Sequence, residues 1–324
     1  MTFSFLKSAD DLPSASITKP VETVMVVGTT AQFDKYLGSW VCDKVLGNLP
    51  TAKTAEGEEP PAKKRKSDAT TSVDPSQHLE LLQALVENSN PGKLANSGTS
   101  SETTLPIGSS FVRVVIGVLP EAVSRHNAPG QTHNYVNILK KGYSPKKVNL
   151  LVSLDDDTSH HSAICTAVGR VAGVSYQRKA GKASGVPNES AVDAEASILV
   201  VFPTANNDAE AHEILCKGML QTRQLVDAPT NELHTTAFVQ KALTVAQTLP
   251  NTTAKVISGK DLESQGYGGI YGVGKAAAHP PALVILEYAP PNCAADAESI
   301  CMVGKGIVYD TGGLSMKTKA TMPG

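Results

Sequence analysis

Lys305, Asp310 and Lys317 lie within one glycine-rich stretch of the sequence, VGKGIVYDTGGLSMKTKATMPG (303–324). Lys305 and Asp310 flank an apolar run, and Lys317 follows in a loop that the intervening glycines allow to turn back. An aspartate supplies the oxygen ligands that divalent cations accept, whereas a lysine ligates a metal only as the neutral amine. A second lysine that stays charged could polarise a carbonyl group. These residue types are suited to a metal centre with an adjacent electrophile.

Two other interpretations fit the same residues. A Lys-x4-Asp pair without further context is most often a surface ion pair, because isolated pairs have no unique geometry. The run IVYDTGG also matches the pattern of aspartic proteases, in which two carboxylates share one proton. That mechanism needs a second such aspartate, and no other Asp-Thr-Gly occurs in this sequence. The missing second aspartate therefore disfavours the aspartic protease, whereas spacing alone does not decide between a metal centre and a surface ion pair.

The same stretch resembles the metal-binding loop of the leucyl aminopeptidase family, which reads Val-Gly-Lys-Gly, a hydrophobic pair, Asp-(Ser/Thr)-Gly-Gly and Leu/Ile-Ser-x-Lys. Tyr309, Thr311 and the closing TMPG are similar to the branch of probable aminopeptidase-like proteins. Three upstream segments resemble other parts of the family, namely VSRHNAPGQTH (123–133), RQLVDAPTNELHTTAF (223–238) and GGIYGVGKAAAHPPALVILEY (268–288). The resemblance is good from residue 110 to residue 324 and thin before that.

The resemblance implies a metallo-aminopeptidase, a hydrolase that releases N-terminal amino acids from peptides. Carried over by position, Lys305 binds one metal ion, Asp310 bridges two, and Lys317 is the charged electrophile beside the scissile carbonyl. The implied cofactors are two divalent ions, zinc or manganese, which lower the pKa of a bridging water. The implied partners are peptides with a free N-terminus and, in a complete version, five further copies in a homo-hexamer.

The chain departs from the family pattern in one respect. The family supplies a further aspartate shortly after MPG and then an Asn-Thr-Asp-Ala-Glu-Gly-Arg motif, neither of which is present. Two ligands do not hold two metal ions in a defined geometry. We therefore expect a chain that is truncated at its C-terminus and inactive alone. The alternative is a non-catalytic interaction or oligomerisation protein derived from the aminopeptidase.

Alternating apolar runs and helix-like segments predict an α/β fold. We expect an N-terminal α/β domain with a mixed sheet over 1–205, a linker helix over 206–230 and a partial catalytic α/β domain over 231–324. Disordered insertions are expected near 51–75 and 90–104, where charged or small polar residues offer little to bury. The expected strands are 23–28, 111–119, 149–154, 197–202, 254–257, 282–288 and 300–310, and the expected helices are 31–46, 76–88, 133–141, 159–172 and 236–248.

Composition limits the class of protein. The 29 basic and 31 acidic residues nearly cancel, so no global field attracts nucleic acid or anionic membrane. No apolar run is long enough to span a bilayer, and the N-terminus lacks the pattern of a secretory signal. The 5 cysteines lack CxxC spacing, which is typical of a reducing compartment. We expect a cytoplasmic protein.

A basic block and three histidines are the remaining sequence features that could have a function. The basic block PPAKKRKSD (60–68) matches the pattern of a nuclear import signal. It would equally serve to solvate a loop. It lacks the aromatic residues that interleave with basic ones in a nucleic-acid site. His160 and His161 open a helix-like stretch, and His234 lies beside a helix start. Adjacent side chains on a helix point to different faces, so capping or exposure is the expected role of these histidines.

Overall fold

The computed structural model describes residues 2–14, 19–49, 75–92, 95, 97–107, 110–123, 128–145, 147–173, 197–294 and 296–308. The chain divides into two compact units, Met1–Val226 and Asp227–Gly324.

A six-stranded mixed sheet forms the centre of the first unit, with the strand order β1-β6-β5-β2-β4-β3. Neighbouring strands run parallel except β3, which pairs antiparallel with β4 at one edge. The chain moves from β2 to β4 on one side and then returns to β5 on the other side of β2. The strands are β1 (Thr2–Phe5), β2 (Thr23–Thr29), β3 (Thr99–Ile107), β4 (Ser110–Leu119), β5 (Val148–Ser153) and β6 (Ser197–Val201).

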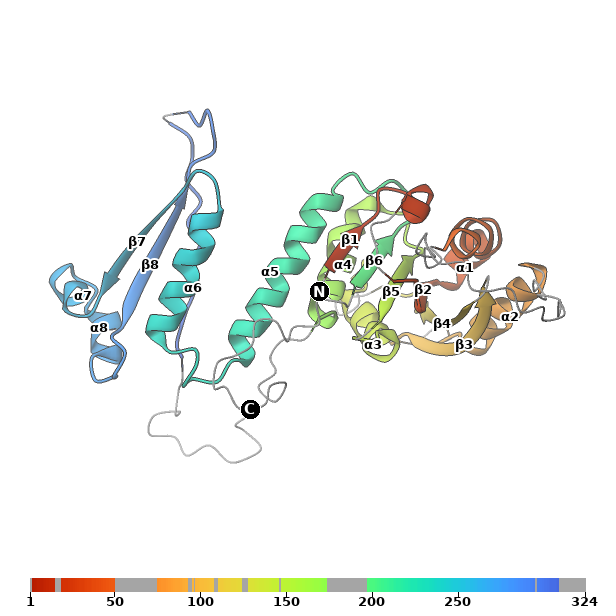
Figure 1. Ribbon diagram of the computed structural model, residues 1–324, viewed down its shortest axis with the longest axis horizontal. Helices are drawn as coiled ribbons and strands as arrows, with labels where there is room; N and C mark the ends of the chain where they lie inside the picture. The colour runs from red at the N-terminus through yellow and green to blue at the C-terminus, as the bar shows by residue number, and fades with distance from the viewer. Residues whose placement is uncertain are drawn as a thin grey trace, which may run out of the picture. The chain divides into compact units, whose positions relative to one another are not determined.

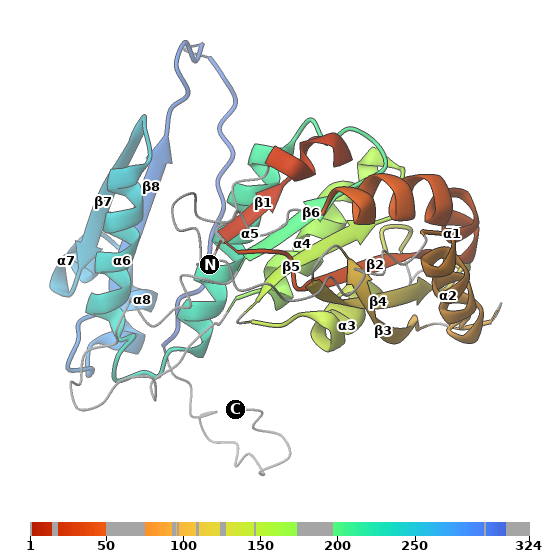
Figure 2. The same cartoon turned by 45° about the vertical axis from the view of Figure 1, so that its right-hand side comes forward.

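Helices cover both faces of this sheet, because its central strands are apolar on both sides (Figures 1 and 2). Along β2, Val24 and Val26 pack on one face, and Met25 and Val27 pack on the other. The first face is covered by α1 (Thr30–Tyr36), the π-helical η2 (Leu37–Val45), η3 (Leu46–Asn48) and α2 (Pro75–Asn88), and the second by α3 (Thr132–Gly142), α4 (His161–Val171) and α5 (Ala209–Asp227). Two short turns, η1 (Ala9–Ser14) and η4 (Thr158–His160), complete the unit.

The α/β fold class is confirmed, and the four strands expected in the first unit are observed at β2, β4, β5 and β6. The expectation of disorder over 90–104 is wrong for residues 99–104, which lie in β3 and pair with β4. Threonine, which occurs three times in β3, is enriched in strands although it forms no apolar run. Most of the other expected insertion, residues 51–74, lies outside the described residues.

The long helix expected after Asp208 is α5, but its buried face differs from the expected one. The large aliphatic side chains had indicated a face through Ala211, Leu215, Met219 and Val226. The buried residues are instead Ala209, His212, Cys216 and Leu220, while Ile214 and Val226 are 63% and 76% exposed. Three of these four buried side chains are small or polar. At Gly169 of α4, an added Cβ would lie only 3.1 Å from the Cα of Cys216.

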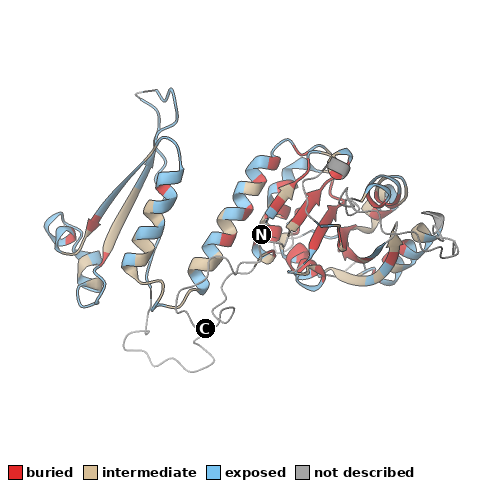
Figure 3. Cartoon of the chain, viewed as in Figure 1, coloured by how far each residue is buried: buried red, intermediate tan, exposed pale blue. Residues whose placement is uncertain are grey.

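The second unit is built on a two-stranded antiparallel sheet of β7 (Thr252–Ser258) and β8 (Ala282–Tyr288). Three helices accompany it, α6 (Thr235–Thr248), α7 (Lys260–Ser264) and α8 (Gly268–Gly274). Ile257, Leu262 and Ala246 are buried, whereas most of both strands is partly or fully exposed (Figure 3). One face of this sheet thus remains open within the described part of the chain.

The strand expected over 300–310 is not observed in its described part, residues 300–308. Ile300, Met302 and Val303 are 91%, 92% and 93% exposed. A strand needs a neighbour to pair its backbone groups, and no described strand pairs with this segment. The apolar run therefore has β-strand composition but neither strand pairing nor burial.

Two glycine substitutions should change the stability of the first unit in opposite directions. An alanine Cβ at Gly28 would lie 2.8 Å from the Cβ of Leu154, whereas Gly218 in α5 has nothing within 4 Å. We expect Gly28→Ala to cost about 1–3 kcal/mol by overpacking. Gly218→Ala should stabilise by roughly 0.5–1 kcal/mol through helix propensity.

Urea unfolding, monitored through the fluorescence of Trp40, measures the stability of the first unit in both variants. Trp40 is the single tryptophan of the sequence, so the signal reports on this unit. A destabilising Gly218→Ala or a neutral Gly28→Ala would contradict the packing described here.

Candidate functional site

Lys305 is the one residue of the predicted metal centre that lies within the described chain. It is exposed, on an irregular segment that follows β8. Its neighbour Gly306 packs against α6, since a Cβ at that position would lie 3.2 Å from Cε1 of Phe238. The absence of a side chain at Gly306 therefore allows the segment carrying Lys305 to approach the helix closely.

The start of α6 is fixed by two histidines. The ring Nδ1 of His234 accepts a hydrogen bond from the backbone N–H of Ala237 at 3.3 Å and so caps the helix. The same ring stacks on His279 with centroids 3.4 Å apart and planes 6° from parallel. His279 Nδ1 lies 3.2 Å from Thr236 Oγ1. Because Phe238 lies one turn further along, these contacts also fix the surface on which Gly306 lies.

Asp310 and Lys317 lie outside the described residues. Over 2–308, with its gaps, the structure contains no group of three or more histidine, cysteine, aspartate or glutamate side chains placed to hold a metal ion. The amine of Lys305 and the carboxylate of Asp310 are metal-ligand types, so the donor chemistry suits a divalent ion. Two donors are nevertheless fewer than a closed or catalytic site requires. The fit of the predicted residues to a two-metal centre is therefore partial.

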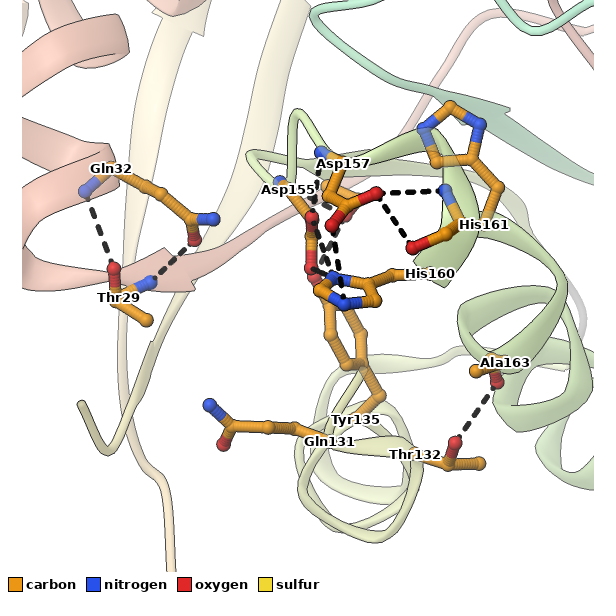
Figure 4. A network of polar contacts seen from close by, with 12 residues as sticks. Thr29, Gln32, Gln131, Thr132, Tyr135, Asp155, Asp157, His160, His161 and Ala163 are labelled. Carbon is orange, nitrogen blue, oxygen red and sulfur yellow. Dashed lines mark hydrogen bonds and ion pairs between the residues drawn. The ribbon is translucent and has the colours of Figure 1, made fainter. Parts of the chain in front are cut away.

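A second concentration of polar side chains lies where β5 ends in the first unit (Figure 4). His160 Nδ1 lies 3.0 Å from Asp155 Oδ2, and His160 Nε2 lies 3.5 Å from Asp157 Oδ2. Behind them the Tyr135 hydroxyl bonds Ser153 Oγ at 2.7 Å, and burial raises the pKa of this tyrosine. Figure 4 shows the ring of His161 turned away from both aspartates.

The polar groups of this second cluster bond one another. Asp156 accepts hydrogen bonds from Lys35 Nζ and from the Tyr36 hydroxyl, each at 2.7 Å, and these bonds lower the pKa of Asp156. Thr29 and Gln32 cap α1 reciprocally at the end of the adjacent strand β2. These contacts join the segments that follow β2 and β5. The cluster therefore has a structural role in holding these segments together.

Two family models match the chain. The M17 aminopeptidase N-terminal domain 2 matches residues 22–182, and the catalytic domain of the cytosol aminopeptidase family matches residues 220–324. The chain belongs to the M17 aminopeptidase family. The resemblance seen in the sequence is thereby confirmed, and the predicted site residues all fall within the catalytic-domain match.

Individual relatives agree with the family assignment. The chain is 32% identical to human "Probable aminopeptidase NPEPL1", over 78% of its own length and 45% of the relative's. It is 35% identical to "Leucine aminopeptidase 1" of Caenorhabditis elegans, over 63% of its own length and 40% of the relative's. The crystal structure of an M17 aminopeptidase from Trypanosoma brucei superposes with a TM-score of 0.71 at 25% identity, covering 98% of this chain and 54% of that one. The chain thus spans about half the length of these M17 relatives.

Capping or exposure was the expected role of His234, and His234 is the N-cap of α6. Sequence reasoning missed the burial of two other histidines. His161 and His212 are buried at 3% and 4% exposure, whereas capping or exposure was expected of His161. Their burial depends on neighbours distant in sequence, Phe202 and Phe5, and so had no local signal.

Gly306→Ala should loosen the segment that carries Lys305. The added methyl group would press on Phe238, and overpacking typically costs about 1–3 kcal/mol, so we expect hydrogen exchange in the α6 peptide that contains Phe238 to rise roughly fivefold or more. Exchange measured by mass spectrometry on this peptide tests the expectation.

Gly304→Ala is the matched control, because it flanks Lys305 on the other side and a Cβ there has nothing within 4 Å. Adding Phe238→Leu to Gly306→Ala should restore protection. Equal hydrogen exchange in the two alanine variants would show that the contact of Gly306 with Phe238 does not hold the segment against α6.

Proposed function

We propose that this M17 protein acts in the metal-dependent release of N-terminal amino acids from peptides. The observation that carries the proposal is the match of both family domains along one chain, with the Lys305 segment inside the catalytic one. The names of the relatives, aminopeptidases from human and nematode, support the same activity. The substrates are peptides with a free N-terminus.

We assign three roles within the segment 303–324. Lys305 would hold a metal ion through its neutral amine, and Asp310 would supply carboxylate oxygens to the metal ions. Two bound divalent ions, zinc or manganese, would supply a hydroxide at neutral pH and polarise the peptide carbonyl. Lys317 stays charged and stabilises the negative charge that develops on that carbonyl oxygen. Gly306 and Phe238 position Lys305 for this role.

Residues 1–324 supply only part of this centre, so we propose that this polypeptide has no turnover on its own. Lys305 and Asp310 are two donors, and two ions in a defined geometry need more. A polypeptide that also contains the acidic ligand motif of the family should be the active, homo-hexameric form. Within the described chain no helix is long and apolar enough to cross a membrane, and the cytosol aminopeptidase relatives support a cytoplasmic location.

A second candidate function is interaction without catalysis, in which the first unit binds complete subunits of the same family. The specific observation that favours it is the difference between the two units. The first unit buries both faces of its sheet, whereas the apolar side chains of 300–303 in the second are almost fully exposed. A folded domain joined to a partial catalytic domain would be suited to assembly rather than turnover.

Activity measurements on two polypeptides distinguish these candidates. Residues 1–324 should hydrolyse a leucine anilide no faster than their own Asp310→Ala variant. A chimera that continues the chain with the corresponding segment of the C. elegans relative should be active. In the chimera, Lys317→Ala should lower turnover by about 100- to 1000-fold, as for loss of one preorganised electrostatic group.

In the same chimera, Lys305→Ala and Asp310→Ala should abolish chelator-sensitive activity by removing metal ligands. A correctly folded chimera without activity would favour the interaction role. Chelator-sensitive turnover by residues 1–324, lost in Asp310→Ala, would show that the site is completed from elsewhere.

The basic block at 63–66 should direct part of the protein to the nucleus if it is an import signal. We expect a fluorescent fusion with Lys63, Lys64, Arg65 and Lys66 changed to alanine to leave the nucleus. Live-cell imaging measures the distribution. A fusion with Lys140 and Lys141 changed to alanine is imaged in parallel as the control for the loss of positive charge. An unchanged distribution would leave the block as a solvating segment only.

A further inference from the structure

Four rings form a continuous row through the second face of the first unit. Phe202 stacks on His161 with centroids 3.7 Å apart and planes 19° from parallel. His161 meets His212 edge-on at 6.4 Å, and His212 lies 5.7 Å from Phe5. All four rings are buried. We call Phe202, His161, His212 and Phe5 the ring row.

The ring row holds α5 against the sheet. Phe5 ends β1, Phe202 directly follows β6, His161 begins α4, and His212 lies in the first turn of α5. His212 Nε2 lies 3.2 Å from Ser162 Oγ, and His161 Nε2 lies 3.4 Å from Thr204 Oγ1. The backbone N–H of Phe5 also donates to Glu213 Oε1 of α5 at 3.4 Å. His161 and His212, the two central members of the row, are its titratable residues.

The surroundings of the two histidines favour their neutral forms. Burial, and then the charge of His212, lower the pKa of His161, while burial lowers the pKa of His212. Asp155 and Asp157 oppose the shift at His161, where His160 adds to it, and Asp208 opposes the shift at His212. Both hydrogen-bond partners of the rings are hydroxyl groups rather than carboxylates. His212 Nδ1 is buried and has no hydrogen-bond partner among the described residues.

A histidine whose pKa is lower in the folded state contributes stability when both states are neutral, above its ordinary value of about 6.5. That stability is lost as the pH falls from there toward the folded-state pKa. Protonation of both rings would also place two like charges side by side in a buried row.

We propose that the ring row is an acid-sensitive contact that releases α5 from the sheet and α4 when His161 and His212 become protonated. Release starts locally, because the central strands of the sheet contain no titratable member of the row. The helix ends at Asp227, the first residue of the second unit. The inference is independent of whether the second unit has aminopeptidase activity.

Hydrogen exchange of the 324-residue chain, corrected for the intrinsic effect of pH, tests this proposal. Lowering the pH from about 7.5 to about 5.5 should raise exchange in α5 peptides roughly fivefold or more, while β5 peptides stay protected. The double variant His161→Phe with His212→Phe keeps four rings in the row and should remove the pH response of α5. His212→Lys, charged at both pH values, should leave α5 unprotected at both.

His133→Gln is the control, because this exposed histidine of α3 lies outside the row and its variant should behave like the parent. Simultaneous loss of protection in α5 and β5 of the parent chain would overturn the proposal without reference to any variant. A pH response in a folded double variant equal to that of the parent would overturn it as well.

Discussion

The need to bury both faces of the central sheet determines the first unit. β2, β5 and β6 are apolar on both sides, so each strand is stable only with helices packed above and below it. The chain meets this need by sending α1 and α2 to one face and α3, α4 and α5 to the other. The same arrangement brings the loops after β2 and β5 together, where Lys35 and Tyr36 bond Asp156.

The second unit meets the same need only in part. Its two strands bury Ile257, but Leu286 and Tyr288 remain 45% and 64% exposed, and the apolar run from Ile300 to Val303 is exposed throughout. This is also the unit that carries the predicted chemistry. Lys305 is held from one side, by the contact of Gly306 with Phe238, and its proposed metal site has two donors. Incomplete burial thus occurs in the same part of the described chain as Lys305.

Sequence reasoning predicted the elements whose signals are local. Long apolar runs identified β2, β4, β5 and β6, and the family resemblance was confirmed. Strands that depend on a neighbour were missed or wrongly assigned: β1 is short, β3 is a polar edge strand, and 300–308 has strand composition without a partner. The buried face of α5 was also wrong, because Cys216 and His212 pack where larger aliphatic residues were expected. The roles of Lys305, Asp310 and Lys317 remain predictions carried by the family motif.

The central claim is that Lys305 and Asp310 are ligands of divalent metal ions. Anomalous X-ray scattering at the zinc edge, from crystals of the chimera grown with zinc, tests it most directly. We predict two anomalous peaks, with the Lys305 Nζ and an Asp310 carboxylate oxygen each within about 2.0–2.3 Å of a peak. Peaks ligated by other residues while Lys305 and Asp310 are ordered, or no peaks in an active enzyme, would contradict the account.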